Sequence, residues 1–218
     1  MHARDQIKIK ELIFKSLGYL SLKESPFKEY THMFSLRSIF DSRPVQPVAS
    51  KASILMKGST EKVFRYLGAD FFENYPKWSP EVKELKQIGD QPMGPGVTAR
   101  QVRIDGGHRS ESKFRITLYE PNRSLAFAGI SEPFHCMYEI QDEGREGLVK
   151  LIFTFELLEM KIFMRPFERL IRIAVQHGAE RTVRNIKNLI EADADIATNT
   201  YDTESYTTTQ TSDERRAG

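Results

Sequence analysis

The sequence predicts an α+β domain in which an antiparallel sheet bends around one long C-terminal helix. Residues 161–191 carry apolar side chains near helical spacing, with charged side chains largely on the other side. Immediately before them, residues 82–158 form short runs that alternate between apolar and polar side chains and are separated by turns. Because short connections force neighbouring strands to be antiparallel, the helices are expected together on one face of the sheet.

Composition limits the class of protein. A chain of 218 residues that is 39% hydrophobic can bury one substantial core and still carry extensions at both ends. Its net charge of +2 comes without a clustered basic face, so we expect no nucleic-acid partner. A single cysteine, Cys136, excludes an intrachain disulfide and a thiolate-rich metal site. The chain lacks a membrane-length apolar run and a secretory signal, so we expect a cytoplasmic protein.

The two ends of the chain are expected to lie outside the domain. Residues 1–49 form an N-terminal extension, in which residues 1–20 read as a short basic amphipathic helix and prolines break residues 21–49 into a linker. That helix either contacts a membrane surface or a partner protein, or packs loosely on the domain. Residues 193–218 are rich in Thr, Ser and Asp, and they predict a disordered tail because they cannot bury enough surface to offset their chain entropy.

The domain itself covers residues 50–192 and opens with a strand over 52–56. Ser59 is a suitable N-cap, with Glu61 in the first turn, for a helix that carries Val63, Phe64 and Leu67. A second short helix covers residues 71–77 and is expected to break near Pro76.

Six strands follow. Their predicted ranges are 82–88, 97–104, 108–119, 125–130, 134–140 and 148–158, and Asp105-Gly106-Gly107 is a strong hairpin turn between the second and third. The long helix over 161–191 completes the domain, with Pro166 near its first turn, where a missing amide costs little.

Alternation along these strands predicts which side chains share the inner face. The four expected inward sets are Ser112, Phe114, Ile116 and Leu118; Leu125, Phe127 and Gly129; Phe134, Cys136, Tyr138 and Ile140; and Val149, Leu151, Phe153, Phe155 and Leu157. The space between such a face and the helix is either filled by side chains as a closed core or contains a pocket. The alternation of the strands does not distinguish these two possibilities.

Two segments carry a family resemblance. Residues 59–67, Ser-Thr-Glu-Lys-Val-Phe-Arg-Tyr-Leu, and 72–80, Phe-Glu-Asn-Tyr-Pro-Lys-Trp-Ser-Pro, resemble the START-like (SRPBCC, helix-grip, Bet v 1-like) superfamily, within it the polyketide cyclase/dehydrase and lipid-transport group. Residues 94–96, 119–127 and 185–191 agree in order. The resemblance implies a helix-grip fold: a seven-stranded antiparallel sheet curved around the C-terminal helix, two short helices between strands 1 and 2, and an internal cavity for a hydrophobic molecule. It carries over no catalytic residues.

Two functions follow as hypotheses. The first is a carrier or sequestering module for a lipid, quinone or polyketide-like molecule, because the inward set is almost wholly apolar. Its expected ligand-binding residues are Phe64, Trp78, Phe114, Phe127, Phe134, Cys136, Tyr138, Phe153, Phe155, Phe163, Phe167 and Ile171. The alternative is a polyketide aromatase/cyclase or dehydratase, for which Tyr138, His177 and Arg103 are the candidate catalytic residues. Whether the protein is an enzyme stays open at this point.

Several side chains admit a structural interpretation beside the functional one. Trp78 is either a rim residue facing the guest or a plug at one end of the sheet. Cys136 is expected to be an inert buried thiol rather than a nucleophile, and His108 and His135 are expected on the surface. No histidines or carboxylates have metal-ligand spacing and no glycine run matches a phosphate cradle, so neither a metal nor a cofactor is expected.

Overall fold

The computed structural model describes residues 47–130, 132–145, 147–159 and 167–213, with side chains described up to residue 192. The predicted helix over 1–20, almost all of the linker, Phe163 and Pro166 lie outside these residues. In chain order the elements are β1 (Val48–Lys57), α2 (Thr60–Phe64), the π-helix η3 (Arg65–Ala69), α3 (Phe71–Trp78), β2 (Val82–Ile88), β3 (Thr98–Asp105), β4 (His108–Glu120), β5 (Ser124–Gly129), β6 (Phe134–Asp142), β7 (Leu148–Leu157) and α4 (Glu168–Asp213).

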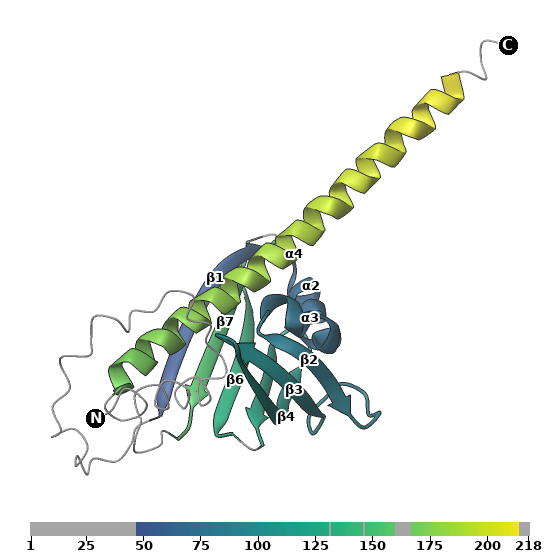
Figure 1. Ribbon diagram of the computed structural model, residues 1–218. Coiled ribbons are helices and arrows are strands. Elements are labelled where there is room, and N and C mark those ends of the chain that lie inside the picture. The colour runs from purple at the N-terminus through teal and green to yellow at the C-terminus, as the bar shows by residue number, and fades with distance from the viewer. Residues whose placement is uncertain (1–46, 131, 146, 160–166, 214–218) are drawn as a thin grey trace, which may run out of the picture.

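The seven strands form one antiparallel sheet in the order β1-β7-β6-β5-β4-β3-β2. β2 to β7 follow one another as a meander, and β1 closes the far edge by pairing with β7, with Val48 opposite Leu157. Figure 1 shows the sheet curving under α4, with α2 and α3 near one end. The predicted helix-grip fold, with two short helices between strands 1 and 2, is confirmed.

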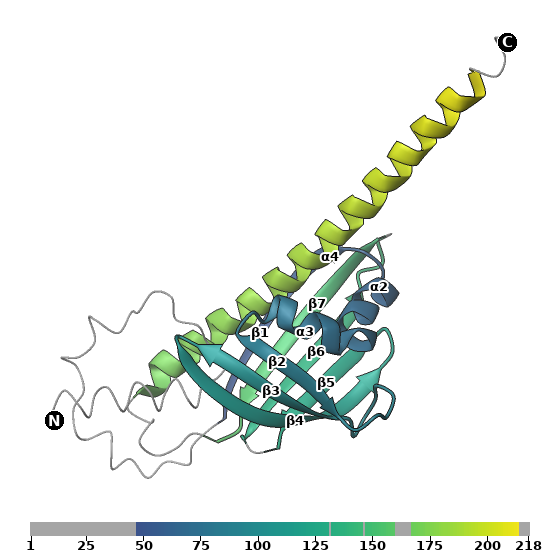
Figure 2. The ribbon, with the colours of Figure 1, turned by 45° about the vertical axis from the view of Figure 1, so that its right-hand side comes forward.

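Helix α4 lies along β1 and is tied to it at two places. Gln176 Nε2 donates to the carbonyl of Lys51 at 3.4 Å, and Glu191 Oε1 accepts from the backbone N–H of Lys57 at 2.9 Å. Beyond these ties the helix continues away from the sheet, as the two views in Figures 1 and 2 agree. The structure thus carries α4 to Asp213, whereas the composition of residues 193–218 predicts a disordered tail, and that disorder stays a prediction.

The two short helices begin where the sequence places them. Ser59 is the N-cap of α2, because its hydroxyl accepts from the backbone N–H of Lys62 at 3.2 Å. The predicted break near Pro76 is wrong, since α3 contains Pro76 and ends at Trp78. Tyr75 and Trp78 are buried, and we infer that their packing holds the last turn in place of the hydrogen bond that proline removes.

Burial largely follows the predicted alternation, although the outward Ala126 and Ile152 are buried as well. The inward sets of β6 and β7 are buried in one hydrophobic core with the inner side of α4. In β4 a register shift between Ile116 and Leu118 interrupts the pairing with β5. The predicted inward placement of Leu118 is therefore wrong: Tyr119 packs against the core instead, with its ring centroid 5.1 Å from that of Phe64.

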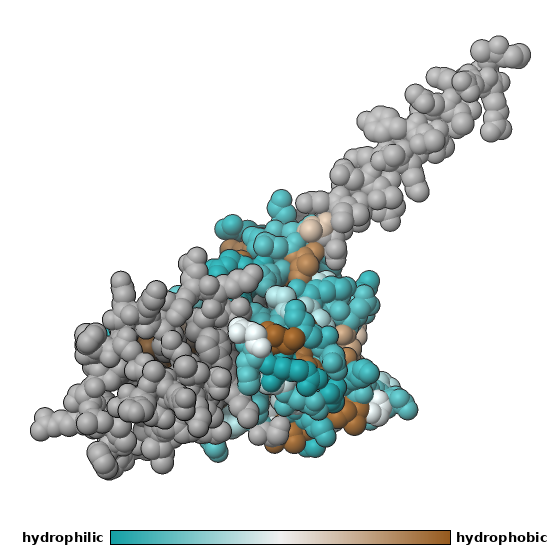
Figure 3. All heavy atoms as spheres, viewed as in Figure 1, coloured by the Kyte–Doolittle hydropathy of each residue, from teal (hydrophilic) through white to brown (hydrophobic). Residues whose placement is uncertain are grey.

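The outer face of the sheet carries charged side chains beside a few exposed apolar ones, Leu55, Ile88 and Ile104. Arg100 pairs with Glu111 at 2.6 Å and with Glu84 at 3.2 Å, and the neighbouring outward Val102 is buried. In Figure 3 the described surface is mostly hydrophilic, with small separate hydrophobic areas. Among the described residues, no helix combines the length and apolar character that a membrane crossing requires.

Candidate functional site

The inner face of β4 to β7 carries a continuous cluster of aromatic rings that also includes the rings of α3. Phe114 and Phe127 lie 4.7 Å apart between ring centroids, as do Tyr138 and Phe153. Phe71 bridges α3 to the sheet, 5.6 Å from Phe127. Spacings of this size are those of rings in direct contact, each pair contributing about 0.5–1.5 kcal/mol beyond its burial. The described part of this aromatic cluster is thus closely packed.

The structure brings the predicted ligand-binding residues together. Those that are buried in the single hydrophobic core are Phe64, Trp78, Phe114, Phe127, Phe134, Cys136, Tyr138, Phe153, Phe155 and Ile171. Phe167 packs against that core half-buried, and Phe163 lies outside the described residues. Their role in binding a ligand stays a prediction.

Trp78 is an interior residue, 1% exposed, rather than a residue of an exposed rim. Its indole N–H donates to the hydroxyl of Tyr138 at 3.3 Å, and its carbonyl accepts from Asn185 Nδ2 at 3.0 Å. The side chain joins α3 to β6 and its backbone joins α3 to α4. The hydroxyl of Tyr138, one of the three catalytic candidates, is consequently held inside the aromatic cluster.

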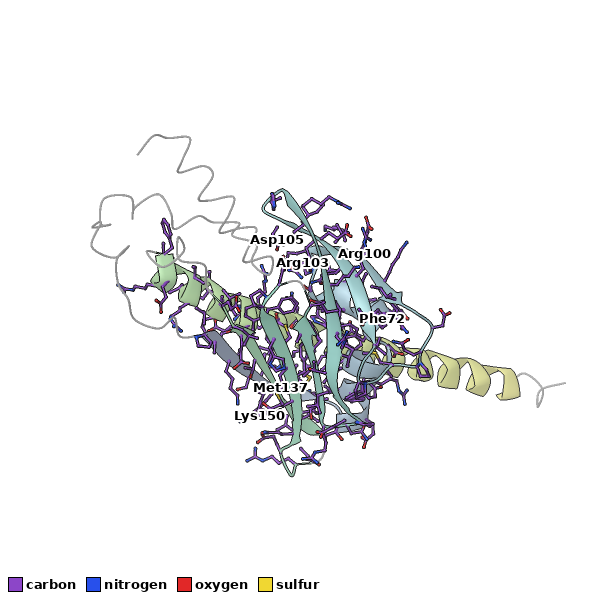
Figure 4. The ribbon with its side chains drawn as sticks, turned by 90° about the horizontal axis from the view of Figure 1, so that it is seen from below. Phe72, Arg100, Arg103, Asp105, Met137 and Lys150 are labelled. Atoms are coloured by element: carbon purple, nitrogen blue, oxygen red, sulfur yellow. The ribbon has the colours of Figure 1, made fainter. Side chains whose placement is uncertain are left out.

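The other two candidates lie in different surroundings. His177 is exposed on α4, so its side chain faces solvent and not the interior. Arg103 is 3% exposed and points to the inner face of β3, where Figure 4 shows it beside Asp105. The structure therefore retains Arg103 and Tyr138 as interior polar groups and removes His177 from them.

Arg103 belongs to a buried polar cluster built on the inner face of β3. Gln101, Arg103 and Asp105 alternate along that strand and are all 2–3% exposed. The Nε atom of Arg103 lies 3.4 Å from Asp105 Oδ2, and its guanidinium donates to Ser79 Oγ at 3.3 Å. We call Ser79, Glu81, Gln101, Arg103, Asp105 and Arg181 the polar cluster.

Two further elements close over this cluster. Glu81, in the connection between α3 and β2, lies 4.0 Å from Arg103 and is itself buried. Arg181 reaches it from α4 and pairs with its other carboxylate oxygen at 2.8 Å. Two arginines and two carboxylates thus meet at one end of the interior, and their formal charges cancel when all four are ionised. Glu81, Arg103 and Asp105 are buried, whereas the side chain of Arg181 is 33% exposed.

Burial raises the pKa of Asp105 from 3.8 to about 6, although the adjacent Arg103 favours the charged carboxylate. The nearby Glu81 adds to the rise, because two negative charges in a buried region repel each other. Asp105 is therefore an interior carboxyl group that changes charge close to neutral pH.

Sequence reasoning missed Gln101, Asp105 and Glu81. Asp105 stands at the start of Asp105-Gly106-Gly107, a turn signal that indicated a surface position. The available signal was the period of two along the strand, which places Gln101, Arg103 and Asp105 on the same face as Ala99. The structure shows that this face is buried. No pattern within the sequence predicts that Glu81 belongs to the cluster, because only the fold brings it close to Arg103.

A metal site needs several His, Cys, Asp or Glu side chains close together. In the ranges that the structure describes, no three side chains of His, Cys, Asp and Glu come together as a metal-binding group. The basic residues of the polar cluster also oppose cation binding there, because Arg103 and Arg181 already neutralise its two carboxylates.

Comparison with known proteins agrees with this architecture. A family described as "Polyketide cyclase / dehydrase and lipid transport" matches residues 47–191, which is every element from β1 to the part of α4 over the sheet. The chain belongs to this family. A search of curated proteins finds no match.

Solved structures with the family's fold resemble this one at low identity. The aromatase/cyclase Zhui from a Streptomyces species, R1128, has a TM-score of 0.56 and 11% identity, over 67% of this chain and 94% of that one. TTHA0849 from Thermus thermophilus has a TM-score of 0.55 and 16% identity, over 66% of this chain and 98% of that one. Ara h 8.0201 has a TM-score of 0.52 and 12% identity, over 67% of this chain and 99% of that one. At such identities the likeness shows the fold alone.

Proposed function

We propose that the protein binds a hydrophobic small molecule, of the lipid, quinone or polyketide-like class, between its sheet and α4, and acts as a carrier or sequestering module. The supporting observation is the inner face itself, where aromatic and aliphatic side chains from all seven strands and from α4 share one buried core. A molecule held there removes apolar surface from water at about 25 cal/mol per Å². The family's description, which names lipid transport, agrees with this class of ligand.

Close ring contacts within the aromatic cluster set a condition on binding. A guest cannot occupy the volume that Phe114, Phe127 and Phe71 fill, so it must lie beside them or move them. The inner side of α4 offers two small buried residues, Ala174 and Gly178. We therefore place the guest between this part of α4 and the sheet, with α4 and α3 shifting to admit it.

Native mass spectrometry of the protein purified from its source tests binding directly. We expect a co-purifying apolar molecule that is lost on denaturation. Ala174→Phe should lower its occupancy by filling the space beside α4, whereas Ile173→Phe, the same introduced ring on the exposed side of the helix, should leave it unchanged. Thermal unfolding of both variants shows that they are folded. Ligand-free protein from the source, together with no binding of lipids or quinones added later, would contradict the proposal.

A second candidate function is supported by the polar cluster. A polyketide aromatase/cyclase or dehydratase must polarise a carbonyl and move a proton inside an apolar site, and Arg103 and Asp105 are buried groups of the right types. Turnover of a poly-β-keto substrate that is lost on Arg103→Met, and kept in His177→Ala, would favour the enzyme over the carrier. Absence of any product while the same molecule binds would leave the carrier function.

A further inference from the structure

The polar cluster directly adjoins the apolar face on which the guest is expected to lie. Along the paired strands β3 and β4, Ala99 faces Phe114, and the next inward pair is Gln101 and Ser112. Arg103 and Asp105 follow on the same strand. Since a strand rises about 3.4 Å per residue, Gln101 lies roughly 7 Å from the Ala99–Phe114 pair and Asp105 roughly 14 Å beyond Gln101. A molecule resting on Phe114 therefore reaches polar groups at one end.

This end of the interior holds hydrogen-bond acceptors that lack a donor. Gln101 donates through Nε2 to Ser112 Oγ at 3.0 Å, but its Oε1 atom, although buried, accepts from no described group. Asp105 Oδ1 likewise has no hydrogen-bond donor in the described part of the chain. Because buried polar atoms are almost always paired, we expect beside these oxygens a donor that the described residues do not supply, and a bound molecule can supply it.

Charge balance limits what that donor can belong to. Arg103 and Arg181 offset Glu81 and Asp105, so a ligand group of either sign would leave an unbalanced buried charge, which is costly. A neutral hydroxyl donates one hydrogen bond and accepts others, whereas a carboxylate donates none and brings a negative charge.

We propose that the polar cluster receives the polar end of the bound molecule, and that this end is an uncharged hydroxyl group rather than a carboxylate. The hydroxyl donates to Gln101 Oε1 or Asp105 Oδ1 while its hydrocarbon part lies against Phe114 and the neighbouring rings. The inference rests on the proposed binding function and narrows its ligands to hydroxylated apolar molecules.

Two probes with the same chain length, 1-decanol and decanoate, test whether the site prefers a hydroxyl group to a carboxylate. Both are titrated at pH 8, where Asp105 is ionised. Emission from Trp78, the only tryptophan, reports binding in the core. We expect decanol to bind at least about ten-fold more tightly than decanoate, a difference of about 1.4 kcal/mol. Asp105→Asn gives the cluster a net positive charge and should reduce or reverse that preference by a similar factor.

Two further variants keep the test decisive. Gln101→Leu removes an unpaired acceptor without changing charge and should weaken decanol binding several-fold while leaving decanoate unchanged. Asp90→Asn is the control for Asp105→Asn, because it replaces the same side chain at an exposed position. It should leave the affinities for decanol and decanoate unchanged. Equal affinities in the unmodified protein, or a preference that neither interior variant alters, would overturn the hydroxyl site and leave hydrophobic binding standing. If neither probe binds, the hydroxyl site fails, and native mass spectrometry of the protein from its source decides the binding function separately.

Discussion

The inner face of the sheet has two halves that obey the same alternation and are built from opposite chemistry. On β5, β6 and β7 the inward positions are aromatic or aliphatic, and rings such as Phe127 and Tyr138 contact one another across the strands. On the β3–β4 hairpin the inward positions become polar from Gln101 onward. The aromatic half draws its stability from burial, whereas the polar half depends on how completely its buried charges compensate each other. The polar half is therefore the part of the inner face where we expect a polar group of a ligand to bind.

The largest expected effect lies in the aromatic half. Phe127 contacts rings from both α3 and the sheet and is fully buried. Phe127→Ala should therefore lower the free energy of unfolding by about 3–5 kcal/mol, because the cavity it leaves cannot close fully. Urea denaturation measures the change. Ile130→Ala, at a position that is 50% exposed, serves as control and should cost about 0.5 kcal/mol or less. Equal losses in the two variants would mean that the ring cluster is not the core of the domain.

In the polar half, removing one charged side chain should lower the free energy of unfolding nearly as much as Phe127→Ala does. Arg103→Met leaves Asp105 and Glu81 facing each other with only Arg181 for compensation, and breaking a buried ion pair in this way costs about 3–5 kcal/mol. Adding Asp105→Asn to the same chain should restore much of the loss, because the second change removes the uncompensated charge. If the double variant is as unstable as Arg103→Met alone, the two side chains do not interact as their 3.4 Å separation indicates.

These two halves were not equally predictable from the sequence. Apolar alternation placed Phe127, Phe153 and their neighbours on the inner face correctly, because burial of large apolar side chains leaves a period that needs no knowledge of the partner strands. The bulge that turns Tyr119 inward carries no such signal. Asp105 was missed because an Asp before two glycines is typical of an exposed turn, so the motif indicated a surface position. Arg103 was a candidate from sequence, but its partner Glu81 is 22 positions away, and Arg181, which pairs with Glu81, is 78 positions away from Arg103. Only the fold brings the three together.

The dependence of stability on pH separates the polar half from the aromatic half, which carries no charge to titrate. Asp105 has a pKa of about 6 in the folded protein and an ordinary value near 3.8 when unfolded. Between these values the folded state binds more protons, so the contribution of Asp105 is fully present below about pH 3.8 and is lost as pH rises through 6. At about 1.4 kcal/mol per pH unit, the loss is at most about 3 kcal/mol.

Asp105→Asn lacks this titration. Its stability relative to the unmodified protein should rise between pH 4 and pH 7, measured by urea denaturation at each pH. Asp90→Asn, an exposed site, supplies the comparison curve and should run parallel to the unmodified protein. Parallel curves for Asp105→Asn as well would show that Asp105 titrates normally and that its burial does not penalise the carboxylate.

The smallest effect tests the hydrogen bond that joins the side chains of Trp78 and Tyr138 in the aromatic half. Tyr138→Phe removes the hydroxyl that accepts from the indole N–H of Trp78 at 3.3 Å and keeps the ring that stacks near Phe153. The indole N–H is then left in a dry interior, which should cost about 1–1.5 kcal/mol. Tyr119→Phe, at a half-buried ring on the edge of the same core, is the matched control and should cost less. A loss for Tyr138→Phe as large as that for Phe127→Ala would mean that polar contacts, and not ring burial, stabilise this half, and the contrast between the two halves of the inner face would no longer hold.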